Sequence, residues 1–390
     1  MKKILYVTGS RAEYGIVKRL LAALKNDQDI ELTIIATGMH CDERYGLTYK
    51  QIEKDGFVIE ELINININTL TNSDIINSMS VCQQKFGNYF QRNKFDAVML
   101  LGDRYEIFAV AVAAAIHNLP IIHIHGGEKT LGNYDEFIRH SITKMARFHL
   151  ASTEQYRKRI IQMGECPNSV VNIGALGAEN ALLMALPSKS ELEEKYGALT
   201  HPYFVVVFHP ETLSQTSPTK QIRELLTALL ELKDSYNFIF IGSNSDTGSD
   251  EIMKEIMGFC QLTNSRIFES VKPEDYLAFN KYSQGLIGNS SSGLIEIPSL
   301  LIPTINVGDR QKGRVRGSTV IDCECSAEAI KSAIFLSQEA DFQNSLKYAE
   351  NPYYKKAVLE NAMRVIKLFV CNGIKTIKIF MISTSIYIIG

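Results

Sequence analysis

Small polar residues interrupt an apolar segment in the stretch GLIGNSSSGLIEIPSL, residues 285–300. This order predicts a buried strand, a turn that contains Ser290 and Ser291, and a helix whose first backbone N–H groups have no partner within the helix. N–H groups at the positive end of a helix bind anions, phosphates above all. Glu296 lies in the following segment, where a carboxylate is suited to accept two hydrogen bonds from ribose hydroxyls. We therefore expect a nucleoside diphosphate site here.

Other strand ends in the second half carry polar side chains. His209 follows the run VVVF, Asn244 follows FIFIGS, and Arg310 lies in the glycine-rich loop GDRQKGRVRG. Because ligands of parallel sheets bind beyond the carboxyl ends of the strands, we expect these side chains to line the same edge as the serine turn. The cations of the loop either neutralise phosphate or lie on the surface.

Acids, imidazoles and guanidinium groups follow strands in the first half. Arg11 lies in TGSRAEYG, Asp103 and Arg104 follow AVMLLG, and the segment HIHGGEKTLGNYDEFIRH contains His125, Glu128 and Asp135. Acid and imidazole groups at two adjacent strand ends are typical of an acid–base site in this architecture. A surface salt bridge is the alternative interpretation of Arg11.

The sequence does not support binding of a nicotinamide dinucleotide or of a metal ion. The turn TGSRAEYG lacks the G-x-G-x-x-G pattern, so a nicotinamide dinucleotide is not expected. His123 and His125 form an H-x-H pair that is compatible with zinc, but no Cys or His completes a clear ligand set. We therefore expect neither a metal nor another cofactor.

The segments that position these residues alternate between short β-branched runs and amphipathic stretches. Apolar strands that alternate with helices predict parallel sheets covered on both faces. A polar, proline-containing segment at residues 186–203 divides the pattern. We predict an α/β fold of two doubly wound, Rossmann-like domains that face a cleft, with the acid–base residues in residues 1–185 and the nucleotide site in residues 186–370.

The composition of the chain limits the classes of partner that it is expected to bind. The chain has 390 residues, is 45% hydrophobic and 22% charged, and carries a formal net charge of -2. We therefore expect no nucleic acid and no membrane as partner, and phosphate recognition must be local. The 7 cysteines are odd in number and scattered, which favours reduced thiols and a cytoplasmic location.

Residues 371–390, CNGIKTIKIFMISTSIYIIG, depart from the pattern of the rest of the chain. They contain seven isoleucines and no acid, and they lack helical periodicity. Polar interruptions argue against a membrane span, which needs ~20 mostly apolar residues. We interpret this tail as an atypical end produced by a frameshift, and we expect it to have no part in catalysis.

The motifs taken together resemble a known family. The serine turn, Glu296 and GDRQKGR resemble the UDP-N-acetylglucosamine 2-epimerases, whose two-domain fold is glycosyltransferase-B-like. TGSRAEYG, TGMHCDERYG, LGDRYE and FHPET are similar in particular to the hydrolysing branch, the NeuC-type enzymes of sialic acid biosynthesis. The likeness covers roughly residues 1–370, and the motifs occur in the same order and context.

The resemblance implies roles for individual residues. The residues expected to bind the UDP part and the rest of the substrate are Arg11, His40, Arg104, His209, Asn244, Ser290, Ser291, Glu296 and Arg310. Asp103 and Asp135 match catalytic carboxylates. Relatives place a glutamate where this chain has His125, so its acid or base role passes to His125 or to Glu128.

The implied reaction removes the C2 proton of UDP-N-acetylglucosamine, expels UDP from C1 and adds water, which yields N-acetylmannosamine and UDP. It needs no redox cofactor, and the resemblance implies a homo-oligomer, a dimer or a tetramer. The alternatives are UDP-diacetylbacillosamine as substrate, for legionaminic acid synthesis, and a glycosyltransferase of the same fold. A third alternative is a non-catalytic protein that senses nucleotide sugars.

Overall fold

A computed structural model of the chain describes residues 1–242 and 245–372. The strands of the first half are β1 (Lys2–Thr8), β2 (Ile30–Thr37), β3 (Glu61–Ile63), β4 (Ala97–Leu101), β5 (Ile121–Ile124), β6 (Phe148–Ala151) and β7 (Val170–Asn172). They form one parallel sheet in the order β3-β2-β1-β4-β5-β6-β7. The order reverses between β1 and β4, which is where sheets of this kind bind ligands.

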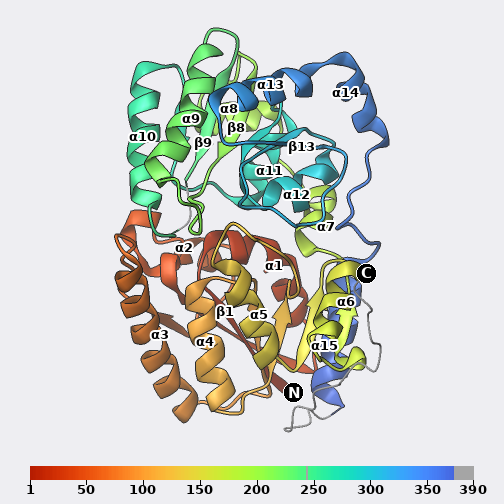
Figure 1. Cartoon of the computed structure of the whole chain (residues 1–390). Helices are drawn as coiled ribbons and strands as arrows, with labels where there is room; N and C mark the ends of the chain where they lie inside the picture. Colours follow the sequence, from red (N-terminus) through yellow and green to blue (C-terminus); the bar gives the residue numbers. More distant parts are fainter. Residues whose placement is uncertain (243–244, 373–390) are drawn as a thin grey trace, which may run out of the picture.

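Helices cover both faces of this sheet (Figure 1). They are α1 (Arg11–Lys25), α2 (Tyr49–Lys54), α3 (Asn72–Arg92), α4 (Tyr105–Ile116), α5 (Asp135–Met145), α6 (Glu154–Gln162) and α7 (Leu176–Leu183), with short 3-10 helices η1 (Gly38–Cys41), η2 (Glu43–Tyr45) and η3 (Pro167–Ser169). Helix α1 begins with a capping box, in which Ser10 accepts a hydrogen bond from the Glu13 N–H and Glu13 accepts one from the Ser10 N–H. This pair satisfies two N–H groups at the helix start and fixes the turn after β1.

The second half repeats the plan. Its strands are β8 (Tyr203–Val207), β9 (Asn237–Ile241), β10 (Arg266–Phe268), β11 (Leu286–Gly288), β12 (Thr304–Val307) and β13 (Val320–Cys323). They form a parallel sheet in the order β10-β9-β8-β11-β12-β13. Its helices are α8 (Lys189–Tyr196), α9 (Pro218–Glu231), α10 (Ser249–Leu262), α11 (Pro273–Lys281), α12 (Ser292–Ile295), α13 (Ala327–Gln338) and α14 (Ala340–Ser345), with η4 (Ile297–Leu300) and η5 (Leu346–Tyr348).

The last described helix, α15 (Val358–Cys371), returns to the first half of the molecule (Figure 1). Its buried side chains Val358, Ala362, Val365, Ile366 and Val370 belong to the core of the first sheet. The apolar face of α15 is therefore buried against the first half of the chain. The division near residue 185 stays a prediction.

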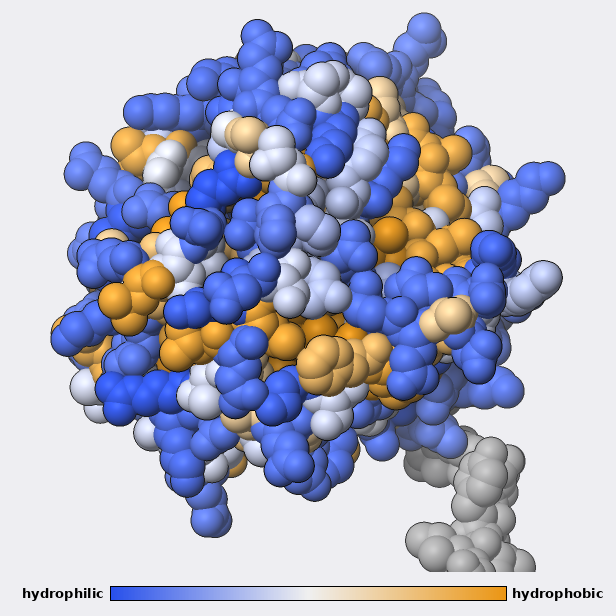
Figure 2. Space-filling model, turned by 90° about the horizontal axis from the view of Figure 1, so that it is seen from above, coloured by the Kyte–Doolittle hydropathy of each residue, from blue (hydrophilic) through white to orange (hydrophobic). Residues whose placement is uncertain are grey.

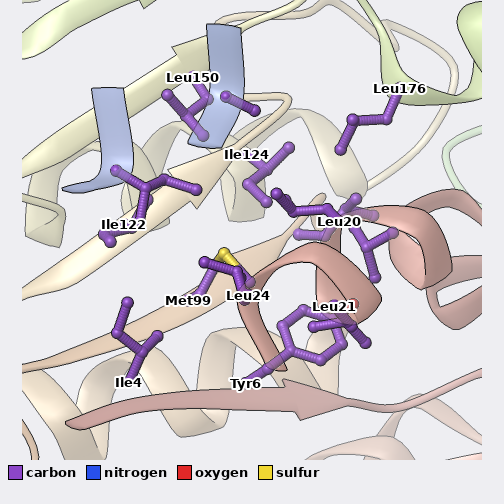
Figure 3. Close-up of a cluster of buried hydrophobic side chains, with 14 of the residues drawn as sticks. Ile4, Tyr6, Leu20, Leu21, Leu24, Met99, Ile122, Ile124, Leu150 and Leu176 are labelled. Atoms are coloured by element: carbon purple, nitrogen blue, oxygen red, sulfur yellow. The ribbon is translucent and has the colours of Figure 1, made fainter. Parts of the chain in front are cut away.

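The first core shows how the sheet holds its helices. In Figure 3, Leu20, Leu21 and Leu24 of α1 meet Ile4 and Tyr6 of β1, Met99 of β4 and Ile122 and Ile124 of β5. Each of these side chains is fully buried. Burial of a large apolar side chain is worth ~1.5–3 kcal/mol, so this contact fixes α1, and with it the turn that carries Arg11.

The outer surface of the second half is mostly hydrophilic, with apolar side chains in separate patches (Figure 2). Among the described residues, no helix has both the length and the apolar character that crossing a membrane requires. The predicted α/β fold with two doubly wound parallel sheets is confirmed. The interpretation of the tail as a frameshifted end concerns residues that, from 373 on, lie outside the described part of the chain.

Candidate active site

The candidate site is a cleft between the carboxyl ends of the two sheets. It encloses a cavity of about 220 Å³ and is lined by both halves of the chain. The expected site residues that line it are Arg11, Asp103, Arg104, Asp135, His209, Ser290, Ser291, Glu296 and Arg310. The structure thus brings together members of both expected sets, the acid–base residues Asp103 and Asp135 and most of the expected substrate-binding residues.

The serine turn follows β11 at its closest approach to β8. Gly288 has φ +137°, and a Cβ atom there would lie 1.9 Å from the Val207 carbonyl oxygen, so only glycine fits. The expected helix after the turn is a single four-residue segment, α12, which breaks off at Glu296. The hydroxyl and backbone N–H groups of Ser290 and Ser291 are therefore the donors that this turn presents to the cleft, with little contribution from a helix dipole.

His209 is held beside the serine turn by Asn289. The His209 N–H donates to Asn289 Oδ1 at 2.8 Å, and Asn289 Nδ2 donates to the His209 carbonyl at 2.8 Å. Burial and the nearby guanidinium groups of Arg310 and Arg104 hold the pKa of His209 well below its ordinary value. The imidazole is therefore neutral at physiological pH and suits hydrogen bonding rather than charge neutralisation.

Glu296 lies in the wall of the cleft opposite helix α7. A Cβ atom on Gly177 would lie 2.9 Å from Glu296 Cγ, so the glycine leaves the room that this side chain occupies. Desolvation raises the pKa of Glu296. The Tyr276 hydroxyl donates to Ser292 Oγ at 2.9 Å and lines the same cleft. Sequence reasoning missed Tyr276, because a tyrosine within a helix gives no strand-end signal.

Arg11 joins the two halves of the chain. Its guanidinium group donates to Ser270 Oγ at 2.8 Å and to the Val271 carbonyl at 2.7 Å. Burial lowers the pKa of Arg11 to about 10. The alternative of an isolated surface salt bridge is wrong, because the side chain bridges the cleft through neutral acceptors.

The carboxylates of the first half come from two neighbouring strand ends. Asp103 follows β4 and forms an ion pair with Arg139, which is buried and also donates to the Glu128 carbonyl at 3.2 Å. Asp135 is the first residue of α5, and Asn133 Nδ2 donates to Asp135 Oδ2 at 3.0 Å. The two carboxylates are thus oriented by different partners, a guanidinium group and an amide.

A second carboxylate faces Asp135 from the other half. Arg310 lies 3.5 Å from Asp135 Oδ2 and 3.8 Å from Asp246 Oδ2, so it is flanked by both acids. Burial and the proximity of Asp246 raise the pKa of Asp135 to about 7. Sequence reasoning missed Asp246, although its position in SNSDTG after β9 was the signal that could have found it.

Arg104 connects the same cluster to Glu106 of α4. Arg104 Nε lies 2.6 Å from Glu106 Oε1, Arg104 Nη2 donates to Ser245 Oγ, and Arg104 Nη1 lies 3.9 Å from Asp246 Oδ1. Glu13 lines the cleft nearby. Burial and the charge of Glu106 raise the pKa of Glu13 to about 8.

Three expected residues lie behind the cleft wall. Glu128 and His125 are close together, with His125 Nδ1 3.3 Å from Glu128 Oε1, but neither lines the cavity. Glu128 instead lies 2.7 Å from Arg314, which does line it. His40 is fully buried, with its ring nitrogens 3.1 Å from Thr8 Oγ1 and 2.8 Å from Thr48 Oγ1.

Asn244 lies outside the described residues. Within residues 1–242 and 245–372, no three His, Cys, Asp or Glu side chains are grouped so that they could hold a metal ion. The groups that line the cleft include the carboxylates of Asp103, Asp135, Asp246 and Glu296, several arginines, and the hydroxyl and N–H donors of the serine turn.

Fold and cleft together define a protein of the two-domain, glycosyltransferase-B-like class. The family model described as UDP-N-acetylglucosamine 2-epimerase matches residues 22–367. The chain belongs to the UDP-N-acetylglucosamine 2-epimerase family.

Individual relatives agree with this assignment. The chain is 59% identical over 380 residues to "Polysialic acid biosynthesis protein P7" of Escherichia coli, covering 97% of each chain. It is 38% identical over 326 residues to the hydrolysing GDP/UDP-N,N'-diacetylbacillosamine 2-epimerase of Campylobacter jejuni, covering 83% of this chain and 84% of that one. The crystal structure of UDP-GlcNAc 2-epimerase from Neisseria meningitidis bound to UDP-GlcNAc superposes with a TM-score of 0.77 at 16% identity, covering 93% and 99% of the two chains.

Proposed function

We propose that the chain is a hydrolysing 2-epimerase that converts UDP-N-acetylglucosamine and water to N-acetylmannosamine and UDP. One observation carries this proposal. A single cleft presents the serine turn and Glu296 on the side of the second sheet, and Asp103 and Asp135 on the side of the first. A nucleotide that binds to the serine turn and Glu296 extends its sugar towards Asp103 and Asp135.

The second half binds the UDP part. Ser290 and Ser291 donate hydrogen bonds to the diphosphate, and Arg310 neutralises charge that develops on the leaving UDP. Glu296 accepts hydrogen bonds from the ribose hydroxyls, which are strong because the acceptor is charged. His209, held neutral by its surroundings, contributes a hydrogen bond at the same end.

The first half carries out the proton transfers. Asp103 accepts the C2 proton, because its ion pair with the buried Arg139 holds the carboxylate towards the cleft. As the C2–H bond breaks, the C1–O bond to UDP breaks and a C1–C2 double bond forms. Water then adds its hydroxyl group to C1, and C2 receives a proton on the opposite face. Asp135, whose pKa of about 7 leaves it partly protonated at neutral pH, is suited to donate that proton.

The biological role follows from the relatives. Identity of 59% to a polysialic acid biosynthesis protein supports N-acetylmannosamine as a precursor of sialic acid, for a capsule or lipooligosaccharide. The 7 free cysteines support a cytoplasmic location. A homo-oligomeric state remains part of the proposal.

The Campylobacter jejuni relative, named for diacetylbacillosamine, supplies the second candidate substrate. Incubation of the purified chain with UDP-N-acetylglucosamine and, separately, with UDP-diacetylbacillosamine tests the choice when the products are identified by NMR. We expect free N-acetylmannosamine and UDP from the first substrate at the higher kcat/KM. Preference for the second substrate would reassign the pathway to legionaminic acid. UDP-linked mannosamine as sole product, or turnover that requires an acceptor sugar, would contradict the proposal.

A further inference from the structure

Asp246 is a buried carboxylate of the cleft with no role in the chemistry described so far. It follows β9 in the second half, is 3% exposed and lines the cavity. Its Oδ2 atom has no hydrogen-bond partner among the described residues. The closest cations are Arg310, 3.8 Å from Oδ2, and Arg104, 3.9 Å from Oδ1. Neither distance is that of a direct hydrogen bond.

The two arginines closest to Asp246 already have acidic neighbours without a ligand. Arg310 is flanked by Asp135 and Asp246, and Arg104 lies between Glu106 and Asp246. A nucleoside diphosphate brings at least two further negative charges to these arginines. Uncompensated charge in a buried site is unfavourable, because the site lacks the solvation that water provides. Something in the cleft must therefore lose negative charge when the diphosphate binds.

On the basis of the proposed function, we propose that Asp246 is a positioning residue that acts through Asp135, and that this carboxylate pair takes up one proton from solvent when the diphosphate binds. The diphosphate replaces the two acids as partner of the arginines, and the proton removes the excess charge. Asp135 then holds the proton in its carboxyl group, ready to donate it to C2 of the sugar.

The surroundings of Asp135 support this assignment. Besides Asp246, the charged groups that face it are Arg310, Arg104 and Arg314, and the neighbouring Tyr134 and His209 also titrate. Burial raises the pKa of Tyr134 beyond the physiological range, and the arginines and burial hold His209 neutral. Two carboxylates that line the cleft have a pKa near neutrality, Asp135 at about 7 and Glu13 at about 8. Of these two, only Asp135 has a pKa that the charge of Asp246 raises.

Calorimetric titration of UDP into the full chain, in two buffers of different ionisation enthalpy, measures the number of protons taken up. At pH 8, above the pKa of free Asp135, we expect uptake close to one proton per bound UDP. At pH 6 we expect clearly less, because Asp135 already carries the proton. Asp246→Asn removes the like charge, so we expect uptake at pH 8 to fall to less than half and the alkaline limb of the kcat profile to move to lower pH.

Asp250→Asn is the matched control, because Asp250 lies four residues further on, outside the cleft, and contacts Thr69. We expect it to leave proton uptake unchanged. UDP binding without proton uptake at pH 8, or uptake that Asp246→Asn leaves intact, would overturn the inference while the proposed function stands. Failure of the wild-type chain to bind UDP at all would overturn both. Should Asp246→Asn not fold, the wild-type chain still tests the inference, because UDP binding without proton uptake at pH 8 contradicts it.

Discussion

The Glu128 carboxylate lies 2.7 Å from the guanidinium group of Arg314, and this ion pair joins the two halves of the chain behind the wall of the cleft. Both side chains are buried. Ser152 Oγ donates to the other carboxylate oxygen at 2.7 Å. Arg314 lines the cavity and Glu128 does not. Glu128 therefore contacts a residue of the cleft wall and not the cavity itself.

Glu128→Gln tests this relationship. Removal of one partner leaves the Arg314 charge buried and unpaired, which typically costs ~3–5 kcal/mol. We expect a decrease of that size in the free energy of unfolding, measured by denaturant titration. The double variant Glu128→Gln with Arg314→Met should lose less than the sum of the two single losses. Strict additivity would show that the pair does not contribute as a unit.

Asp103 and His125 should differ sharply in their effect on turnover. Replacing a positioned acid–base group typically costs ~100- to 10,000-fold, and we expect Asp103→Asn to fall in that range with little change in UDP affinity. His125 has φ +64° and lies outside the cavity. Asparagine tolerates this backbone conformation, so His125→Asn should retain turnover within ~10-fold. Steady-state kinetics of both variants checks the expectation, with Asp234→Asn at an exposed position as control. A decrease in kcat for His125→Asn as large as for Asp103→Asn would show that the imidazole takes part in the reaction.

Glu296 should matter for the nucleotide and not for stability. If it accepts the ribose hydroxyls, Glu296→Ala should weaken UDP binding by ~1.5–3 kcal/mol, the usual worth of hydrogen bonds to a charged group. Calorimetry with UDP measures this directly. The melting temperature should change little, because burial raises the pKa of Glu296 and makes its charge unfavourable in the empty site. Unchanged UDP affinity would remove Glu296 from the nucleotide site.

Two truncations separate the tail from the last described helix. A chain that ends at Asn372 retains α15, and we expect full turnover and better solubility, because it lacks a β-prone apolar segment. A chain that ends at Ala357 lacks α15 and exposes the part of the first core that Val365 and Ile366 cover. It should be insoluble or unfolded by circular dichroism. Loss of activity in the longer chain, when it is folded, would show that the tail contributes to function.

The sequence predicted the sheets well, because apolar β-branched runs and the polar residues at their ends are local signals. It also predicted most of the cleft, since residues at the carboxyl ends of parallel strands must meet at one edge. Arg11, Asp103 and Ser290 are of this kind. The serine turn was predicted only in part. Its small polar residues marked the turn itself, but the helix that follows, α12, is short because the chain turns at Glu296.

Contacts across the cleft were beyond the reach of the sequence. That Asp246 would face Asp135 depends on how the two halves are placed, which no local pattern encodes. The positions of Glu128 and His125 behind Arg314 depend on the course of the loop that carries Arg314, and the return of α15 to the first core depends on a surface left open by the other helices. The sequence of residues 358–371 carries no local signal that says which surface the apolar face of this helix packs against.

The central claim is elimination followed by addition of water, and incubation with UDP-N-acetylglucosamine in D₂O tests it most directly. The C2 hydrogen of the product comes from solvent in this mechanism, and the nucleotide must leave. We expect N-acetylmannosamine with deuterium at C2 and one free UDP for each sugar formed, measured by NMR and mass spectrometry. Retention of the original hydrogen at C2, or a product that still carries UDP, would contradict the mechanism.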